Sequence, residues 1–164
     1  MKSNHILKVL PVLSGFFIMG FCDIVGIASD YVQRTFDWSS TMTGFIPSMV
    51  FVWFLFLGIP IGNLMNRWGR KRTVLISMAV TVIGMLLPLV DYTSLTCVAA
   101  FMMLGIGNAI LQVSLNPLLT DVVNGRYVTS ALTAGQVIKA LSSLMGPEFI
   151  LLAIGMFGEA HWYY

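Results

Sequence analysis

The residues of this sequence that could do chemistry are polar and charged groups that stand singly inside long apolar stretches. Asp23 and Lys139 are among those that carry charge. Four others recur at every fourth position: Asn108, Gln112, Asn116 and Thr120. A carboxylate can accept hydrogen bonds from hydroxyl groups or take up a proton, and a carboxamide offers both a donor and an acceptor. These residue types favour the binding of a small polar molecule.

The fourfold spacing of that row places its members on one face of a helix, because residues four apart lie one above the other. Polar groups in hydrocarbon are costly, so each requires a partner or a function. One interpretation is hydrogen bonding between packed helices, which contributes about 1 kcal/mol for each contact. A row of four is longer than packing requires, and it favours a second interpretation, a face that lines a wet cavity.

A second polar face is predicted near the end of the sequence. Its positions have helical spacing: Thr133, Gln136, Lys139 or Ala140, and Ser143. Lys139 stands too deep in its apolar stretch to reach water by extending its side chain, so it must face a wet cavity or an acid. Asp23 is the candidate acid, and the two readings, a structural ion pair and a binding role, are compatible.

The composition indicates the solvent in which these residues work. Only 10% of the 164 residues are Asp, Glu, Lys or Arg, and 57% are apolar, whereas soluble proteins have about 25% and about 45–50%. Too few charges are present to cover a water-exposed surface, so we expect an integral membrane protein. The two cysteines, Cys22 and Cys97, both lie in apolar stretches, which excludes a disulfide scaffold and a paired-cysteine zinc site. A net charge of +2 gives no argument for nucleic acid.

Five stretches have the length of a membrane-spanning helix, about 17–25 apolar residues. They are residues 6–27, 44–65, 74–90, 95–113 and 131–157, and the fourth is expected to continue past Asn116 and Pro117. Short connections separate them at 39–41, 66–73, 91–93 and 124–126. The predicted fold is all-α, a polytopic bundle of about five transmembrane helices that forms one domain over residues 1–164.

The basic residues predict the orientation of this bundle, because cytoplasmic loops are enriched in Lys and Arg. With the N-terminus in the cytoplasm, seven lie inside: Lys2, Lys8, Arg67, Arg70, Lys71, Arg72 and Arg126. Arg34 lies outside, and the outer loops hold Asp30, Asp37 and Asp91. We expect a multi-pass protein of the inner membrane. The aromatic run at 162–164 is typical of a membrane interface, and we expect this chain to be the front part of a longer protein.

The run Gly-Asn-Leu-Met-Asn-Arg-Trp-Gly-Arg-Lys-Arg at 62–72 resembles the loop between the second and third helices of the major facilitator superfamily. Asn66 stands where that family usually has Asp, so it keeps hydrogen bonding without the charge. The resemblance implies a motif for conformational switching, made of Gly62, Asn66, Arg67, Gly69, Arg70 and Lys71. We expect Arg67 and Arg70 to lie near helix C-terminal carbonyls or near Asp121, and Gly69 to keep the loop tight.

A narrower resemblance is to the fucose, galactose and glucose–proton symporters. It rests on the order and spacing of Gly15–Phe21 before Asp23, Gly44-Phe45-Ile46, Ile59–Gly62, the pair Asn116-Pro117 four residues after Gln112, and Gln136. That group has Glu at the position of Gln112, and its first-helix Asp falls near Gly26. The resemblance implies twelve helices in two halves, with binding between the halves. This chain would then supply most of the first six-helix half.

The leading interpretation is a secondary transporter that takes up a hexose or deoxyhexose with protons. The expected substrate-binding residues are Asp23, Asn108, Gln112, Asn116, Gln136 and Lys139. The expected partners are a sugar, protons, membrane lipid and the missing second half of the same transporter, without cofactor, metal or nucleic acid. Two alternatives are an exporter of another small molecule and a membrane fragment that does not transport. The sequence has no Ser-His-Asp set or metal cluster, so we do not expect an enzyme.

Overall fold

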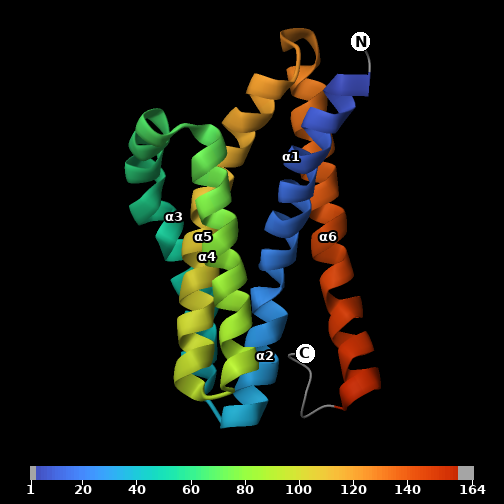
Figure 1. Ribbon diagram of the computed structural model, residues 1–164. Helices are drawn as coiled ribbons and strands as arrows, with labels where there is room; N and C mark the ends of the chain where they lie inside the picture. The colour runs from blue at the N-terminus through green and yellow to red at the C-terminus, as the bar shows by residue number, and fades with distance from the viewer. Residues whose placement is uncertain (1–2, 159–164) are drawn as a thin grey trace.

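The computed structural model describes residues 3–158, with side chains from Val9 onward, and the described part is helical apart from short turns. The elements are α1 (Ser3–Phe21), the 3-10 turn η1 (Cys22–Ile24), α2 (Val25–Phe36), α3 (Ser40–Trp68), α4 (Arg70–Val90), α5 (Ser94–Val122), the 3-10 turn η2 (Gly125–Tyr127) and α6 (Val128–Phe157). Figure 1 shows them as a bundle of long helices. Lys2, the side chain of Lys8 and the aromatic run at 162–164 lie outside the described residues and side chains.

Five segments of the described chain are long and apolar enough to cross a membrane, which confirms the predicted all-helical architecture. The first of them, Val9–Phe36, runs through α1, η1 and α2, and the others correspond to α3, α4, α5 and α6 with η2. Because a bilayer core offers no water to pair with main-chain groups, a spanning segment must make its hydrogen bonds within a helix. The bilayer core therefore accounts for both features: it favours apolar side chains, and it requires main-chain hydrogen bonds within a helix.

The helices extend further than the apolar stretches predicted, and two expected loops are corrected. Asp30, placed in an outer loop by the sequence, lies inside α2. The expected connection at 66–73 is reduced to Gly69, because α3 continues to Trp68 and α4 begins at Arg70. A helix continues through polar residues as long as their main-chain hydrogen bonds can be made, so hydropathy underestimates its length.

Helix α5 is the centre of the bundle and packs against α4, α3 and α1. One apolar core joins Phe16 and Met19 of α1 to Leu111 and Leu115 of α5. A second core, nearer the other end of α5, is made of Val25, Ala28, Val32, Ile46, Val50, Cys97 and Phe101. Helix α6 packs mainly on α1 (Figure 1). Residues from three helices therefore meet around α5, which carries the row of polar groups.

The end of the bundle opposite the α3–α4 turn is held by specific contacts between turns. The indole Nε1 of Trp38 donates a hydrogen bond to Ser94 Oγ at 2.9 Å, and the rings of Phe36 and Tyr92 lie 5.2 Å apart. Helix α5 begins with a capping box, in which Thr93 and Thr96 satisfy each other's main-chain N–H groups. These contacts fix where α2, α3 and α5 start and stop relative to one another.

Candidate functional site

The two charged residues of the predicted site form an ion pair between α6 and the break in the first span. Lys139 Nζ lies 3.2 Å from Asp23 Oδ2, and the two side chains are 21% and 27% exposed. Asp23 belongs to η1, where the first span changes from an α-helix to a single 3-10 turn. A 3-10 turn within a long helix often marks a hinge. The structure thus places a charge pair, partly open to its surroundings, at an irregular point of a membrane helix.

Small residues on both helices allow α1 and α6 to come close enough for this pair to form. Gly20 of α1 lies against the main chain of Lys139. Ser142 Oγ donates a hydrogen bond to the carbonyl of Phe17 at 2.6 Å. Gly146 of α6 receives the side chain of Ile24. Small residues at helix–helix contacts are typical of membrane bundles, because they let main chains approach.

The row of polar residues on α5 lies on the face between α1 and α3. Gly105 lies against α3, and Leu115 lies against α1. Gln112 follows Gly105 by seven residues, and Asn108 precedes Leu115 by seven. Seven residues make almost two helical turns, so each of these carboxamides shares a face with one of the two contacts. The row therefore follows the part of α5 that faces the space between the first and second spans.

Two carboxamides of this row have side-chain oxygens without a hydrogen-bond partner within the described structure. Asn108 is only 1% exposed, and the side-chain oxygens of Asn108 and Asn116 are buried without a partner. Gln112 is half-buried. The sequence favoured a face that lines a wet cavity, and in the described structure Asn108 on that face is buried. Interhelical hydrogen bonding, the first interpretation of the row, is not observed for Asn108 or Asn116.

The structure brings only part of the predicted site together. Asp23 and Lys139 are in contact, and Gln136 is exposed on α6 three residues before Lys139. No hydrogen bond within the described residues joins Gln112 or Gln136 to that pair. The charged pair at the α1–α6 contact and the carboxamides on α5 are thus not joined by hydrogen bonds in the described structure. Among the described residues, no group of three or more His, Cys, Asp or Glu could hold a metal ion.

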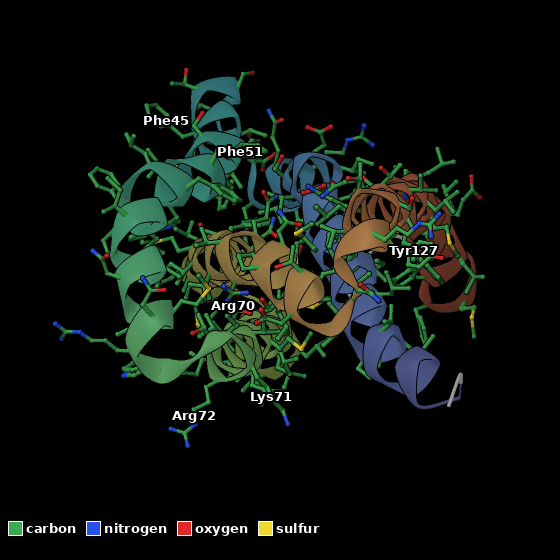
Figure 2. All side chains as sticks on the ribbon, turned by 90° about the horizontal axis from the view of Figure 1, so that it is seen from above. Phe45, Phe51, Arg70, Lys71, Arg72 and Tyr127 are labelled. Carbon is green, nitrogen blue, oxygen red and sulfur yellow. The ribbon has the colours of Figure 1, made fainter. Side chains whose placement is uncertain are left out.

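The turn between α3 and α4 is built around Gly69. Its φ of +85° lies in a region that side chains disfavour, and its N–H caps α3 through the carbonyl of Met65 at 2.9 Å. Arg70 forms an ion pair with Asp121 and donates to the carbonyl of Pro117 at 2.9 Å. Figure 2 shows Arg70 turned toward the middle of the bundle, while Lys71 and Arg72 point outward from its edge.

The expectation for this motif is confirmed for Arg70, which contacts both Asp121 and a carbonyl near the end of α5. Arg67 and Asn66 are exposed at the end of α3, and no contact of Arg67 with an acid or a helix carbonyl is observed. Gly62 is half-buried within α3, and a side chain added there would meet no atom within 4 Å. The motif therefore acts on the packing of α4 against α5 mainly through Arg70.

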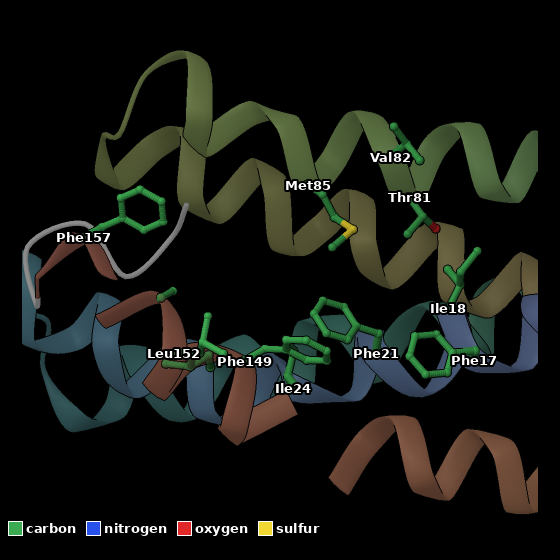
Figure 3. A pocket seen from close by; sticks show the side chains of 12 residues that line it. Phe17, Ile18, Phe21, Ile24, Thr81, Val82, Met85, Phe149, Leu152 and Phe157 are labelled. Carbon is green, nitrogen blue, oxygen red and sulfur yellow. The ribbon is translucent and has the colours of Figure 1, made fainter. Parts of the chain in front are cut away.

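One feature of the site was not predicted from the sequence, an apolar cavity of about 630 Å³ between α1, α4 and α6. Figure 3 shows Phe17, Phe21 and Phe149 on one side of it, facing Met85 and Thr81. The rings of Phe21 and Phe149 meet edge to face with centroids 5.8 Å apart. The aromatic residues on the two helices gave a sequence signal, but aromatic residues in membrane helices most often face lipid or the core.

Comparison with known proteins identifies the family to which this chain belongs. The family model described as Major Facilitator Superfamily matches residues 12–164. Glucose/galactose transporters of Brucella abortus, from biovar 1 strain 9-941 and from strain 2308, are 27% identical over 138 residues, which cover 82% of this chain and 34% of the relative. A class H tetracycline resistance protein of Pasteurella multocida is 27% identical over 139 residues, or 80% of this chain and 33% of that protein.

The chain therefore spans about a third of the length of these curated relatives. No solved structure matches it. The family model covers nearly the whole sequence, and the five apolar helices and the Gly69–Arg70 turn agree with the architecture that the resemblance implied. The chain is a member of the major facilitator superfamily.

Proposed function

We propose that this chain forms part of the first half of a secondary transporter that carries a hexose or deoxyhexose inward across the inner membrane together with protons. The observation that carries the proposal is the row of carboxamides on α5 whose buried oxygens have no partner in the described structure. Leaving a buried polar atom unpaired costs about 1–3 kcal/mol. A bound ligand that supplies hydrogen-bond donors would remove this free-energy cost. The unpaired oxygens are therefore consistent with a ligand-binding role for the row.

The chemistry of the row suits a sugar. Each carboxamide offers an oxygen acceptor and two N–H donors, and a sugar hydroxyl both donates and accepts. The row includes Asn108, Gln112 and Asn116, which lie along one face between α1 and α3. A polyol can bridge several such groups at once. We assign Gln112 the central contact, because it is half-buried rather than covered.

The charged pair supplies the second requirement, a group that can exchange a proton. Asp23 is the only carboxylate within the described part of η1 and its neighbour α1, and its side chain is 27% exposed. The printed name of the Brucella relatives, glucose/galactose transporter, supports a hexose as the substrate class. In this proposal Asp23 takes the proton, and the α5 row, with Gln136, contacts the sugar.

Sugar uptake by the full-length protein tests this proposal. Proteoliposomes would be loaded with and without a proton gradient, and the accumulation of labelled glucose, galactose and fucose would be measured. We expect Gln112→Ala to abolish sugar binding while the protein remains folded. Asn63→Ala is the matched control, because Asn63 is an exposed amide on α3. Unchanged binding in Gln112→Ala would contradict the assignment.

The proton role is tested separately with Asp23→Asn. We expect this variant to equilibrate sugar without accumulating it against a gradient, because its side chain cannot be protonated and deprotonated. Accumulation at the wild-type level would remove Asp23 from the coupling role while leaving the sugar site in place.

A second candidate function is export of an apolar small molecule. It is favoured by the aromatic cavity between α1, α4 and α6 and by the similarity to a tetracycline resistance protein. Everted membrane vesicles distinguish the two functions. Energised accumulation of tetracycline that Phe149→Ala reduces, together with no sugar uptake, would favour export over the sugar proposal.

A further inference from the structure

At Gly20 the main chain of α6 rests directly on the first span. A methyl group at Gly20 would lie 2.9 Å from the carbonyl carbon and 3.0 Å from the Cα of Lys139, and closer still to the Lys139 carbonyl oxygen. These atoms belong to the backbone of a helix, so they cannot turn aside as a side chain would. Any side chain at Gly20 must push α6 away from α1 at Lys139.

Two other glycines of the first span, Gly15 and Gly26, do not lie against main-chain atoms of another helix. At Gly15 an added methyl group would meet the ends of the Leu115 and Met78 side chains, which can rotate. At Gly26 it would meet nothing within 4 Å. Only Gly20 has this relationship with a residue of the charged pair, and it precedes Asp23 by three residues, so the two lie on the same face of the first span.

The ion pair is sensitive to such a displacement. Its 3.2 Å separation is at the long end of hydrogen-bonding distances, about 2.7–3.2 Å. Because the separation is already long, moving α6 outward would lengthen it further and weaken the ion pair. The Ser142 bond to Phe17, one turn further along α6, would be strained by the same movement.

We infer that Gly20 is a positioning residue that brings Lys139 against Asp23, and that this ion pair links the protonation of Asp23 to the contact between α1 and α6. The second part rests on the proposed function, which gives Asp23 a proton. When Asp23 Oδ2 binds a proton the carboxyl becomes neutral, Lys139 keeps its charge and loses its counter-ion, and the electrostatic attraction between η1 and α6 is removed, whereas the Ser142–Phe17 hydrogen bond and the Gly146–Ile24 packing remain. No other bond is made or broken.

The other titratable groups on the packed elements do not replace Lys139. The described side chains of α1 include none. Cys22 is Asp23's neighbour on η1, and α2 carries Asp30, Tyr31 and Arg34, all seven or more residues beyond Asp23. On α5 the titratable side chains are Cys97 and Asp121. On α6 the remaining group is Glu148, which is exposed and nine residues beyond Lys139. Within the described chain, Lys139 is the cation in contact with Asp23.

A mutant cycle on the full-length purified protein tests the positioning role. Melting temperature would be measured for wild type, Lys139→Met, Gly20→Ala and the double variant. We expect Lys139→Met to lower the melting temperature of wild type and to have no further effect in the Gly20→Ala background, where the pair is already broken. Gly26→Ala is the control background, in which Lys139→Met keeps its full effect. Equal effects of Lys139→Met in all three backgrounds would overturn the proposal.

The pH profile of sugar uptake gives a readout that a purely structural role would not move. We expect Gly20→Ala and Lys139→Met to change the profile in the same way, whereas a packing defect alone would scale uptake equally at every pH. If Gly20→Ala does not fold, the pair is tested in the wild-type background with Asp23→Asn, Lys139→Met and the double variant. Non-additive melting temperatures support the ion-pair role, and additive effects overturn it. A non-additive cycle with pH-independent uptake would refute the proton role of the proposed function and keep Gly20 as the positioning residue.

Discussion

The guanidinium of Arg70 donates a hydrogen bond to the main-chain carbonyl of Pro117, 2.9 Å away, and joins the first turn of α4 to the end of α5. The same guanidinium pairs with Asp121, one turn further along α5. The two charged side chains are 40% and 51% exposed, so the ion pair alone contributes only about 0–1 kcal/mol. The carbonyl contact gives Arg70 a fixed position that charge alone would not.

Replacing Arg70 tests this double contact. Arg70→Gln should lower the free energy of unfolding by about 1 kcal/mol, because it removes the ion pair and the carbonyl bond together. Arg70→Lys should recover only part of the loss, since an ammonium lacks the planar fork that reaches two acceptors. Thermal melting of the full-length protein measures both. Arg72→Gln is the control on the exposed side of the same turn, and an equal effect there would contradict the assignment.

Gly69 is predicted to tolerate no side chain without cost. Its φ of +85° and ψ of 148° are in a region that only glycine occupies readily. Gly69→Ala should therefore reduce stability by about 1–3 kcal/mol. Gly125→Ala, in the turn between α5 and α6 and without a positive φ, is the matched control. If the tight turn also serves switching, Gly69→Leu should reduce uptake by more than its loss of folded protein; wild-type uptake would remove that role.

Asn108 is predicted to lower the stability of the protein and to contribute to sugar binding. Its carboxamide oxygen is buried without a partner in the described structure, and such a group costs about 1–3 kcal/mol. Asn108→Leu, of similar size, should keep or raise the melting temperature and weaken sugar binding. Asn63→Leu on the exposed part of α3 controls for the general effect of adding apolar surface. A large loss of stability in Asn108→Leu would show that the amide has a structural bond.

Trp38 is predicted to hold the opposite end of the bundle through one hydrogen bond. Trp38→Phe keeps an aromatic ring beside Phe36 but removes the donor to Ser94, which should cost about 0.5–1.5 kcal/mol. Ser94→Ala should cost a similar amount, and the double variant should cost no more than either. Trp53→Phe, within α3, serves as the control for changing an indole to a phenyl ring. Additive effects of the first two changes would contradict the bond.

Much of the architecture was predictable because it depends on local properties of the chain. A spanning helix needs enough consecutive apolar residues, and five such stretches were visible in the sequence and confirmed in the structure. Asp121 was expected beside Arg70 because both lie at the same ends of neighbouring helices. The helix ends were less predictable, since polar residues such as Asp30 continue a helix when their main-chain bonds are made within it.

The sequence by itself determined the number of membrane spans, the tight turn at Gly69 and which residues are polar enough to need a partner. Only the tertiary structure decided which faces meet. Residues 20 and 139 are far apart in sequence, and their main chains touch because Gly20 has no side chain. The same packing pairs Lys139 with Asp23 and covers Asn108. Hydropathy is a sum over neighbours in the chain, and so it can be read from the sequence. Helix packing depends on the fit between the surfaces of two helices, which the sequence of either helix alone does not determine.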